Sequence, residues 1–360
     1  MASMPIYSSL GVRRVVNACG IYTDLGGSVL SAGVLAAVRE AASTWASMDE
    51  LLDVSGARIA ALCGSQAARV VPGASAGIAL ALGACVARGS GAVMEALPLV
   101  DSVVVMQRGH EYKYARCASL AGARVEWVDD LAAALASRPA AILHPAHLDA
   151  AAVPLDVVAP LARAAGVPVV VDAAYQSFPL SELARWSRAG DVACFSAKYF
   201  FGPNAGGFVA GSSSLVADVA ALDFVGYESG PWRTFGRAFK LDRSAVVATV
   251  VALEEWLAAD HEARWGAYAG LARELAALCG ALPGAEISLS HFTLEETLVD
   301  DGLVNAVLVR GGGDLTDALA ARAVSVRAMF GDDALVFCTE ALTDGEVREV
   351  GAAMSAVWPN

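Results

Sequence analysis

The stretch that decides the fold runs from Asp191 to Gly211 and reads DVACFSAKYFFGPNAGGFVAG. Its first residues predict an apolar strand, and Gly202 and Pro203 then turn the chain back into a second apolar run. Lys198 therefore lies at the mouth of a strand-turn-strand return. Burial between two strands disfavours a charged ammonium, and a neutral amine is the nucleophile that forms Schiff bases with carbonyl groups.

A carboxylate precedes this lysine at the end of another predicted strand. Asp172 follows Val169 to Val171, a β-branched run that is typical of a parallel strand buried on both faces. Ligands of open α/β sheets bind at the C-terminal ends of the strands. A Schiff-base lysine, and a carboxylate that keeps a ring nitrogen protonated, are the groups that pyridoxal phosphate needs. We therefore predict that Lys198 and Asp172 are catalytic residues that bind this cofactor.

A third segment, Pro72 to Gly77, reads PGASAG and opens a predicted helix. Small residues at the start of a helix expose backbone N–H groups, and here a hydroxyl, at the positive end of the helix dipole. We expect Ser75, Ala76 and Gly77 to hold the cofactor phosphate. Glycine-rich turns from strand to helix also occur where nothing binds. The prediction therefore depends on this being the first such turn of the predicted sheet.

The order of these features resembles fold type I pyridoxal-phosphate enzymes. Within that class, three segments resemble the group that contains bacterial selenocysteine synthase (seryl-tRNA selenium transferase) and the D-glucosaminate-6-phosphate ammonia-lyase-like proteins. They are RRVVNACGIYTDLGGS (13–28), VMQRGH (105–110) and GRAFKLDR (236–243). The resemblance covers nearly the whole chain. It implies an α/β fold with a mostly parallel, doubly wound sheet and a smaller α+β C-terminal domain, and it implies pyridoxal 5'-phosphate as the cofactor.

His110 is a further candidate, because it follows a predicted strand within one of these segments. Its planar ring would stack on the cofactor, or it would act as a general acid or base. The alternative is a structural role, which is the commoner one for a lone histidine.

Four more residues are predicted at the cofactor on weaker grounds. Two flank the proposed site and would hydrogen-bond the cofactor, and two lie in the aromatic and basic segment 224–240, where they would meet an anionic group of cofactor or substrate across a dimer interface. For the second pair the alternative is a solvated basic loop. The four are Gln176, Ser196, Arg237 and Lys240.

The composition restricts the partners. The 360 residues carry a formal charge of −13, which argues against nucleic acid and hence against a tRNA substrate. The seven cysteines are scattered and never spaced as C-x-x-C, so neither a disulfide framework nor a zinc site is indicated, and a reducing cytoplasm is expected. No run reaches the roughly eighteen apolar residues of a membrane span. We expect a small amino-acid substrate, no metal and no membrane.

Three parts are predicted along the chain: an N-terminal arm and helix (1–48), a large cofactor-binding α/β domain (49–243) and a small α+β domain (244–360). Between residues 67 and 211, apolar runs alternate mostly with helix-length segments, as in βαβ folds. The run from Gly207 to Ala210 follows too soon for a crossover helix and should be antiparallel. One long helix is expected from Ser244 to about Leu278. The resemblance implies a homodimer or larger assembly, with the arm against a partner subunit.

One position departs from the resembled group. Where relatives carry an arginine shortly before the last helix, this chain has Glu340 in the segment CTEAL. A carboxylate repels an anionic substrate group, so the substrate of the ammonia-lyases does not carry over with the fold.

The resemblance implies chemistry on an α-amino acid through an external aldimine and a quinonoid that the protonated ring stabilises. The first interpretation is a lyase of amino acid metabolism that catalyses an elimination. A second is a carboxamide-forming monooxygenase-decarboxylase that uses pyridoxal phosphate and O2, as in nucleoside-antibiotic biosynthesis. A third is a pyridoxal-phosphate-binding protein without turnover, against which the intact Lys198 and Asp172 speak.

Overall fold

The computed structural model describes residues 5–98, 100–323 and 325–359. The chain divides into two compact units: Ser28–Ala258, which we call the large unit, and Met1–Gly27 with Ala259–Asn360, which we call the small unit. This division differs from the expected boundaries. The first part of the N-terminal arm joins the C-terminal residues, and the helix that follows residue 243 joins the large unit.

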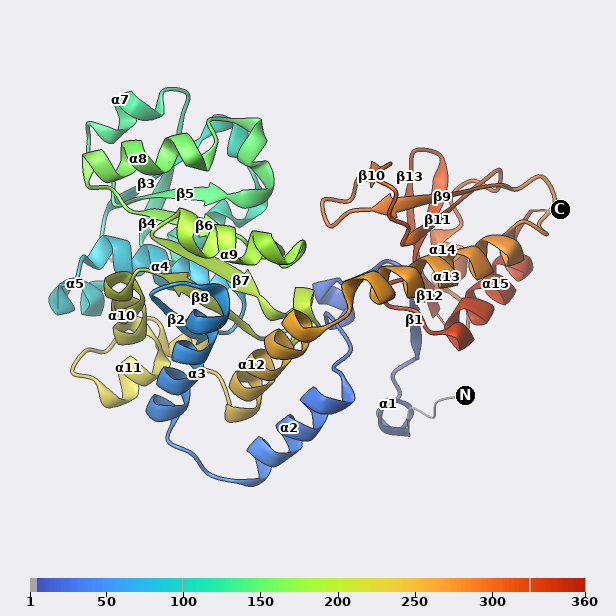
Figure 1. The fold of residues 1–360 in the computed structure, drawn as a ribbon, viewed down its shortest axis with the longest axis horizontal. Coiled ribbons are helices and arrows are strands. Elements are labelled where there is room, and N and C mark those ends of the chain that lie inside the picture. The colour runs from blue at the N-terminus through green and yellow to red at the C-terminus, as the bar shows by residue number, and fades with distance from the viewer. Residues whose placement is uncertain (1–4, 99, 324, 360) are drawn as a thin grey trace. The chain divides into compact units, whose positions relative to one another are not determined.

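The large unit is built on a seven-stranded sheet with the order β2-β8-β7-β6-β5-β3-β4 (Figure 1). All strands are parallel except β8, which pairs antiparallel with both β2 and β7, as its short connection predicts. The mostly parallel, doubly wound sheet expected from the βαβ pattern is confirmed. The strands are β2 (Ala67–Val71), β3 (Ser102–Gln107), β4 (Ala123–Val128), β5 (Ala141–Pro145), β6 (Val169–Asp172), β7 (Val192–Ser196) and β8 (Gly207–Gly211).

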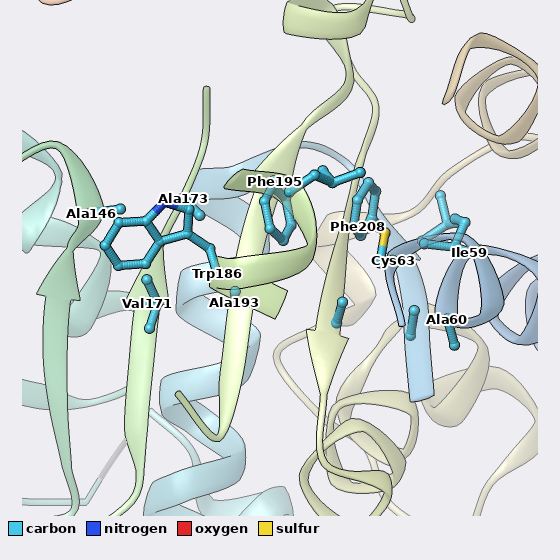
Figure 2. Close-up of a cluster of buried hydrophobic side chains, with 14 of the residues drawn as sticks. Ile59, Ala60, Cys63, Ala146, Val171, Ala173, Trp186, Ala193, Phe195 and Phe208 are labelled. Atoms are coloured by element: carbon cyan, nitrogen blue, oxygen red, sulfur yellow. The ribbon is translucent and has the colours of Figure 1, made fainter. Parts of the chain in front are cut away.

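Both faces of this sheet are buried, because alternate strand residues pack into different cores. On one face Phe195 and Phe208 stack with their ring centroids 4.9 Å apart, and Trp186 from α9 lies in the same cluster (Figure 2). On the other face, Cys194 and Val209 pack against α4 and its neighbours. Strands that consist almost entirely of apolar, often β-branched residues are therefore expected here, because neither face of the sheet meets water.

The helices of the large unit lie in two layers. The core with Phe195 includes residues of α2, α3, α8, α9 and α12, and the core with Cys194 includes residues of α4, α5, α6 and α10. The helices are α2 (Ala32–Ser43), α3 (Met48–Cys63), α4 (Ala74–Ala87), α5 (Gly91–Ala96), α6 (Cys117–Leu120), α7 (Leu131–Leu135), α8 (Leu155–Ala165), α9 (Leu180–Ala189), α10 (Ser213–Leu222), α11 (Phe224–Ser229) and α12 (Arg243–Ala258), with short 3-10 turns η2 (Arg108–His110), η3 (Lys113–Arg116), η4 (Ala146–Ala151), η5 (Ala197–Phe200) and η6 (Arg237–Phe239).

Segment 224–240, expected as a loop, contains α11 and η6. Asp223 organises it, because its side chain accepts hydrogen bonds from the backbone N–H groups of Val225 and Gly226 and caps α11. The same buried carboxylate pairs with Arg69 of β2 at 2.8 Å. The segment is thus tied to the edge of the sheet.

The prediction of one long helix from Ser244 to about Leu278 is wrong, because this segment forms two helices, α12 and α13 (His261–Cys279). The Asp260 side chain accepts a hydrogen bond from the backbone N–H of Ala263 at 2.9 Å and starts the second helix. This break is also where the two units divide.

The small unit holds a five-stranded antiparallel sheet with the order β10-β9-β11-β14-β13, and a separate parallel pair, β1 with β12. The arm therefore adds a strand to its own chain, and the backbone N–H of Cys338 donates to Ala18 at 2.7 Å. The α+β character expected here is confirmed. The elements are α1 (Pro5–Ser9), β1 (Val15–Asn17), η1 (Thr23–Leu25), α13, β9 (Glu286–Phe292), β10 (Leu298–Val299), β11 (Ala306–Arg310), α14 (Thr316–Ala320), β12 (Ser325–Arg327), β13 (Met329–Gly331), β14 (Ala334–Cys338) and α15 (Asp344–Val357).

Among the described residues, no helix combines the length and the apolar character that crossing a bilayer requires.

Candidate active site

The predicted site residues meet at one edge of the large sheet. In the register of the sheet, Asp172 at the end of β6 lies opposite Cys194, two residues before β7 ends at Ser196. Ser196 in turn lies opposite Gly207, the first residue of β8, and Gly207 also lies opposite Val71 at the end of β2. Segments that are far apart in sequence therefore deliver their polar residues to the same place.

Asp172 is buried, with 5% of its surface exposed, and is held by two hydrogen bonds. The backbone N–H of Ala174 donates to Oδ1 at 3.1 Å, and the hydroxyl of Tyr112 donates to Oδ2 at 3.0 Å. Burial raises the pKa of the Asp172 carboxyl to about 6, although both hydrogen bonds oppose that rise. The carboxylate is therefore charged at neutral pH and lies in surroundings of low polarity.

Lys198 follows the end of β7 on the short turn η5 and is 8% exposed. The chain has three lysines, and the other two, Lys113 and Lys240, are exposed. The amine of Lys198 lies 4.7 Å from the centroid of the Tyr199 ring. The turn is fixed to the sheet, since the backbone N–H of Ala197 donates to Gly206 at 2.9 Å.

The N-terminus of α4 lies beside this turn. A methyl group on Gly207 would lie 2.9 Å from Cα of Gly73, the residue that caps α4 with a left-handed φ of 94° and no side-chain cap. Gly77 is packed on the sheet, because a methyl group there would lie 3.0 Å from Val209. The Ser75 side chain is exposed. The first turn of the helix thus offers backbone N–H groups and a hydroxyl to an anion.

His110 does not reach this surface. It is 0% exposed, and its ring packs edge-on against His144 with centroids 4.7 Å apart. Burial lowers the pKa of His110 to about 4, so the ring is neutral at physiological pH. The His110 ring has no exposed surface to present to a ligand in this structure, and its role at the cofactor stays a prediction.

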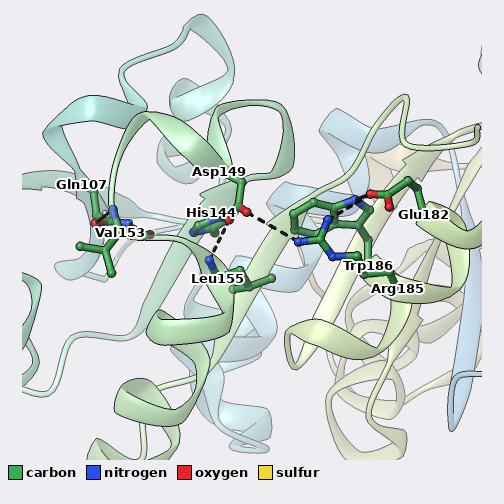
Figure 3. Close-up of polar contacts among 8 residues, drawn as sticks. All are labelled: Gln107, His144, Asp149, Val153, Leu155, Glu182, Arg185 and Trp186. Atoms are coloured by element: carbon green, nitrogen blue, oxygen red, sulfur yellow. Dashed lines mark hydrogen bonds and ion pairs between the residues drawn. The ribbon is translucent and has the colours of Figure 1, made fainter. Parts of the chain in front are cut away.

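One of these two buried histidines, His144, belongs to a set of polar contacts that fixes the loops at the strand ends (Figure 3). Nε2 of His144 lies 2.8 Å from Asp149, which also accepts from the backbone N–H of Leu155 at 2.7 Å. The Gln107 amide makes two hydrogen bonds with the backbone of Val153, at 2.9 and 3.0 Å. These contacts tie the end of β3 to the turn η4.

Sequence reasoning missed an aromatic wall along the same edge. Its members are half-buried side chains in ring contact, each with centroids 5.5 or 5.6 Å from the next, in the order Tyr112, His147, Tyr175 and Tyr199. Tyr175 could have been found from its place three residues after Asp172. Tyr112 could not be separated from His110, which precedes it by two residues in the same loop.

Pyridoxal phosphate, the cofactor of fold type I enzymes, fits these residues. A buried carboxylate suits a protonated ring nitrogen, a buried lysine at a strand end suits an aldehyde, and the uncapped N-terminus of α4 suits a phosphate. The aromatic wall supplies flat, partly exposed rings on the side of Asp172 where Tyr112 lies.

Comparison with known proteins gives the family. No family model matches the chain. It is 32% identical over 301 residues to a 5'-C-glycyluridine monooxygenase-decarboxylase from a Streptomyces species, which covers 77% of this chain and 72% of that protein. The chain belongs to the fold type I pyridoxal-phosphate enzymes. It lies in the family of that monooxygenase-decarboxylase.

Two further likenesses agree with this fold type I assignment. The D-glucosaminate-6-phosphate ammonia lyase of Salmonella typhimurium is 28% identical over 270 residues, which are 70% of each chain. A solved structure of D-glucosaminate-6-phosphate ammonia-lyase matches with a TM-score of 0.85 at 24% identity, over 99% of this chain and 98% of that one. The resemblance stated from the sequence motifs is thereby confirmed.

Arg237 and Lys240, two predicted site residues of this fold type I enzyme, lie in segment 224–240, in its 3-10 turn η6 or next to it. Arg237 pairs with Glu228 of α11. Lys240 is exposed. Phe235, two residues before Arg237, packs on Gly83, nine residues beyond the start of α4, because a methyl group on Gly83 would lie 3.0 Å from the Phe235 ring. At 1.5 Å per residue, Gly83 lies about 14 Å along the helix from Ala74. Gln176 is half-buried, four residues beyond Asp172.

Glu340, which replaces the expected arginine, lies in the small unit beside Arg264 of α13. The backbone N–H of Ile21 donates to it, and a methyl group on Gly20 would lie 2.7 Å from its Oε1. Burial raises the pKa of Glu340 to about 7, although the Arg264 guanidinium opposes that rise. The acid is thus compensated within its own unit, and its charge changes near neutral pH.

Proposed function

We propose that this enzyme holds pyridoxal 5'-phosphate on Lys198, with Asp172 at the ring nitrogen and Ser75, Ala76 and Gly77 at the phosphate. The observation that supports this most is the meeting of three β-strand ends and the start of α4 at one edge of the sheet. We also propose that Ser196, the last residue of β7, and Gln176, four residues beyond Asp172, hydrogen-bond the cofactor.

When bound, the cofactor supplies an electron sink for charge that develops at the α-carbon of an amino-acid substrate. The side chains supply the rest. Asp172 holds the proton of the ring nitrogen by its charge, and its burial strengthens that interaction because water does not screen it. Lys198 would be the base that accepts or returns a proton at the substrate's α-carbon.

We propose oxidative decarboxylation of an α-amino acid that is part of a larger, uncharged metabolite. The substrate R–CH(NH2)–COOH and O2 give the carboxamide R–CO–NH2, CO2 and H2O. The bond from the α-carbon to the carboxyl group breaks, one oxygen atom enters the amide and the other leaves as water. This balances without a further reductant, because the four electrons lost by the substrate reduce O2.

Two observations favour this reaction over the elimination that the sequence placed first. The relative with 32% identity is a monooxygenase-decarboxylase, and the ammonia lyase of a phosphorylated sugar acid is 28% identical. Glu340 also places a carboxylate where the resembled group has a phosphate- or carboxylate-binding arginine. Elimination with release of ammonia remains the second candidate, on the TM-score of 0.85 to the ammonia-lyase structure.

Incubation with aminoacyl nucleosides and free amino acids under 18O2, with an argon control, separates the two reactions. Oxidative decarboxylation gives a product with one 18O atom and releases CO2, and it stops under argon. Elimination releases ammonia equally under both gases and incorporates no 18O. Release of ammonia without dependence on oxygen would overturn the first proposal in favour of the second.

We also propose a homodimer or larger assembly in the cytoplasm. Arg237 and Lys240, two basic residues of segment 224–240, are proposed to reach the site of a neighbouring subunit, since within its own chain Arg237 pairs with Glu228 of α11. All seven cysteines are buried thiols in the described part of the chain, as suits a reducing compartment.

A further inference from the structure

Asp172 has one side-chain donor among its described contacts, the hydroxyl of Tyr112 at 3.0 Å. Its other oxygen accepts only the backbone N–H of Ala174 at 3.1 Å. The carboxylate has 5% of its surface exposed, so these two donors replace most of the water that a surface aspartate would bind. The cofactor's protonated ring nitrogen, in the proposed function, adds a further donor to the same group.

The Tyr112 hydroxyl can act only as the donor in this pair while Asp172 is charged. Burial, and next the charge of Asp172, raise the pKa of the Tyr112 phenol far above its ordinary range. Its proton therefore stays on the tyrosine at every pH at which the protein is folded. A permanent donor stabilises the charged carboxylate relative to the neutral acid.

Two thiols that interact electrostatically with Asp172 bring no charge. They are Cys117 of α6 and Cys194 of β7. Burial raises the pKa of Cys117 to about 11 and that of Cys194 well above its usual value, so both thiols are neutral. Lys198 stands at the same sheet edge, beyond the end of β7. Among the described contacts, Tyr112 is the side-chain group that donates to Asp172.

Tyr112 is held in place from two sides. It lies between the turns η2 and η3, and its ring contacts Tyr114 and His147 with centroids 6.0 and 5.5 Å apart. The turn η2 before it is anchored by the buried His110. The hydroxyl thus reaches Asp172 from a loop that packing fixes at both ends.

We propose that Tyr112 is a positioning residue, whose hydroxyl holds the Asp172 carboxylate charged and in place for the cofactor's ring nitrogen. The inference rests on the proposed binding of pyridoxal phosphate. It makes Tyr112 necessary for the protonated state of the bound cofactor, through Asp172 and not through contact with the reacting atoms.

The test replaces Tyr112 with phenylalanine, which keeps the ring and removes the hydroxyl. Tyr114→Phe is the matched control, because Tyr114 lies in the same loop, contacts Tyr112 and has no described hydrogen bond to Asp172. The first measurement needs no cofactor: titration of the Asp172 carboxyl by 13C NMR of the aspartate-labelled apoprotein, with the signal assigned by its loss in Asp172→Asn. The second is the pH dependence of the Kd for pyridoxal phosphate, with 15N NMR of the labelled ring nitrogen.

Tyr112→Phe should move the Asp172 midpoint upward by about one to two pH units, because hydrogen bonds to charged groups contribute about 1.5–3 kcal/mol. The acid limit of cofactor binding should move with it, and the 15N signal should show a deprotonated ring at pH 7. Tyr114→Phe should match the wild type in all three measurements.

Three results would count against the inference or its basis, and they differ from one another. An unchanged midpoint in Tyr112→Phe apoprotein overturns the hydrogen bond itself. A midpoint that moves without any change in the bound cofactor overturns the positioning role, because the ring nitrogen then replaces Tyr112. Wild-type protein that binds no pyridoxal phosphate refutes the proposed function, while the apoprotein titration still decides the contact.

Discussion

Asp172→Asn should make the apoprotein more stable at neutral pH. Asparagine has the same shape, can accept from the Ala174 N–H and can donate to the Tyr112 oxygen, so the two described contacts survive. What disappears is the cost of a buried charge. Because that charge is needed only when the cofactor is bound, we expect stability and function to oppose one another at this residue.

The magnitude follows from the pKa. Burial raises the pKa of Asp172 from 3.8 to about 6 in the folded protein. Between these values the folded state holds a proton that the unfolded state has lost, so the free energy of unfolding falls as pH rises through that window. One pKa unit corresponds to about 1.4 kcal/mol, so the charge costs about 3 kcal/mol above pH 6. The variant should gain that amount at pH 7 and about half of it at pH 5.

The assay is urea unfolding of cofactor-free protein between pH 5 and pH 8, followed by a probe in the large unit, since a chain of two units does not unfold in one step. Asp101→Asn, at an exposed site, is the control and should show no such trend. A difference between Asp172→Asn and wild type that is flat across this range would refute the buried-charge reasoning. Loss of stability at pH 8 would refute it as well.

Three further variants follow from the structure. His110→Ala should lower the free energy of unfolding by about 2–4 kcal/mol, because it leaves a cavity in the core. The Kd for pyridoxal phosphate should stay near the wild-type value. A variant that no longer binds the cofactor would instead support stacking of His110 on the cofactor ring. Glu340→Gln should stabilise the small unit by about 3 kcal/mol at pH 8 and by about 2 kcal/mol at pH 6, because burial raises the pKa of Glu340 to about 7; equal gains at both pH values would refute a buried charge at this residue. Mixed dimers of inactive Lys198→Ala and inactive Arg237→Ala should recover part of the activity, and failure despite proven subunit exchange would mean that Arg237 serves its own chain.

The sheet and its lysine could be predicted because their signals are local. Apolar runs separated by helix-length segments predict the parallel sheet, and the run Val169 to Val171 ends one residue before the observed end of β6 at Asp172. The antiparallel β8 follows from the length of its connection alone. Asp172 and Lys198 then reach one edge by the topology of a parallel sheet.

Features that depend on distant pairing could not be predicted. Strand β1 is three residues long and pairs with β12, so that Val15 lies opposite Ser325, and nothing near residue 15 indicates a strand. Segment 224–240 is ordered by the pair between Arg69 and Asp223, which are 154 residues apart. Neither contact leaves a periodic pattern.

The same limit on prediction applies within one loop, where the sequence does not show whether His110 or Tyr112 faces Asp172. Both lie in one loop at the end of β3, and a histidine is the more usual acid or base. Which ring faces Asp172 depends on the turn η2, because the His110 ring is fully buried there and the Tyr112 hydroxyl comes within 3.0 Å of Asp172. The break at Asp260 was within reach, because an aspartate before a helix is a recognised cap, but the apolar pattern continues across it.

The proposal that Lys198 carries the cofactor is tested most directly by reducing the cofactor-loaded protein with borohydride and mapping the peptides by mass. The chain has three lysines, Lys113, Lys198 and Lys240, so the adduct has three possible places, and Lys198 is the buried one. We predict a phosphopyridoxyl group on Lys198 at one per chain and no adduct in Lys198→Ala protein. An adduct on Lys113 or Lys240, or none on cofactor-saturated wild type, would contradict the assignment of this site.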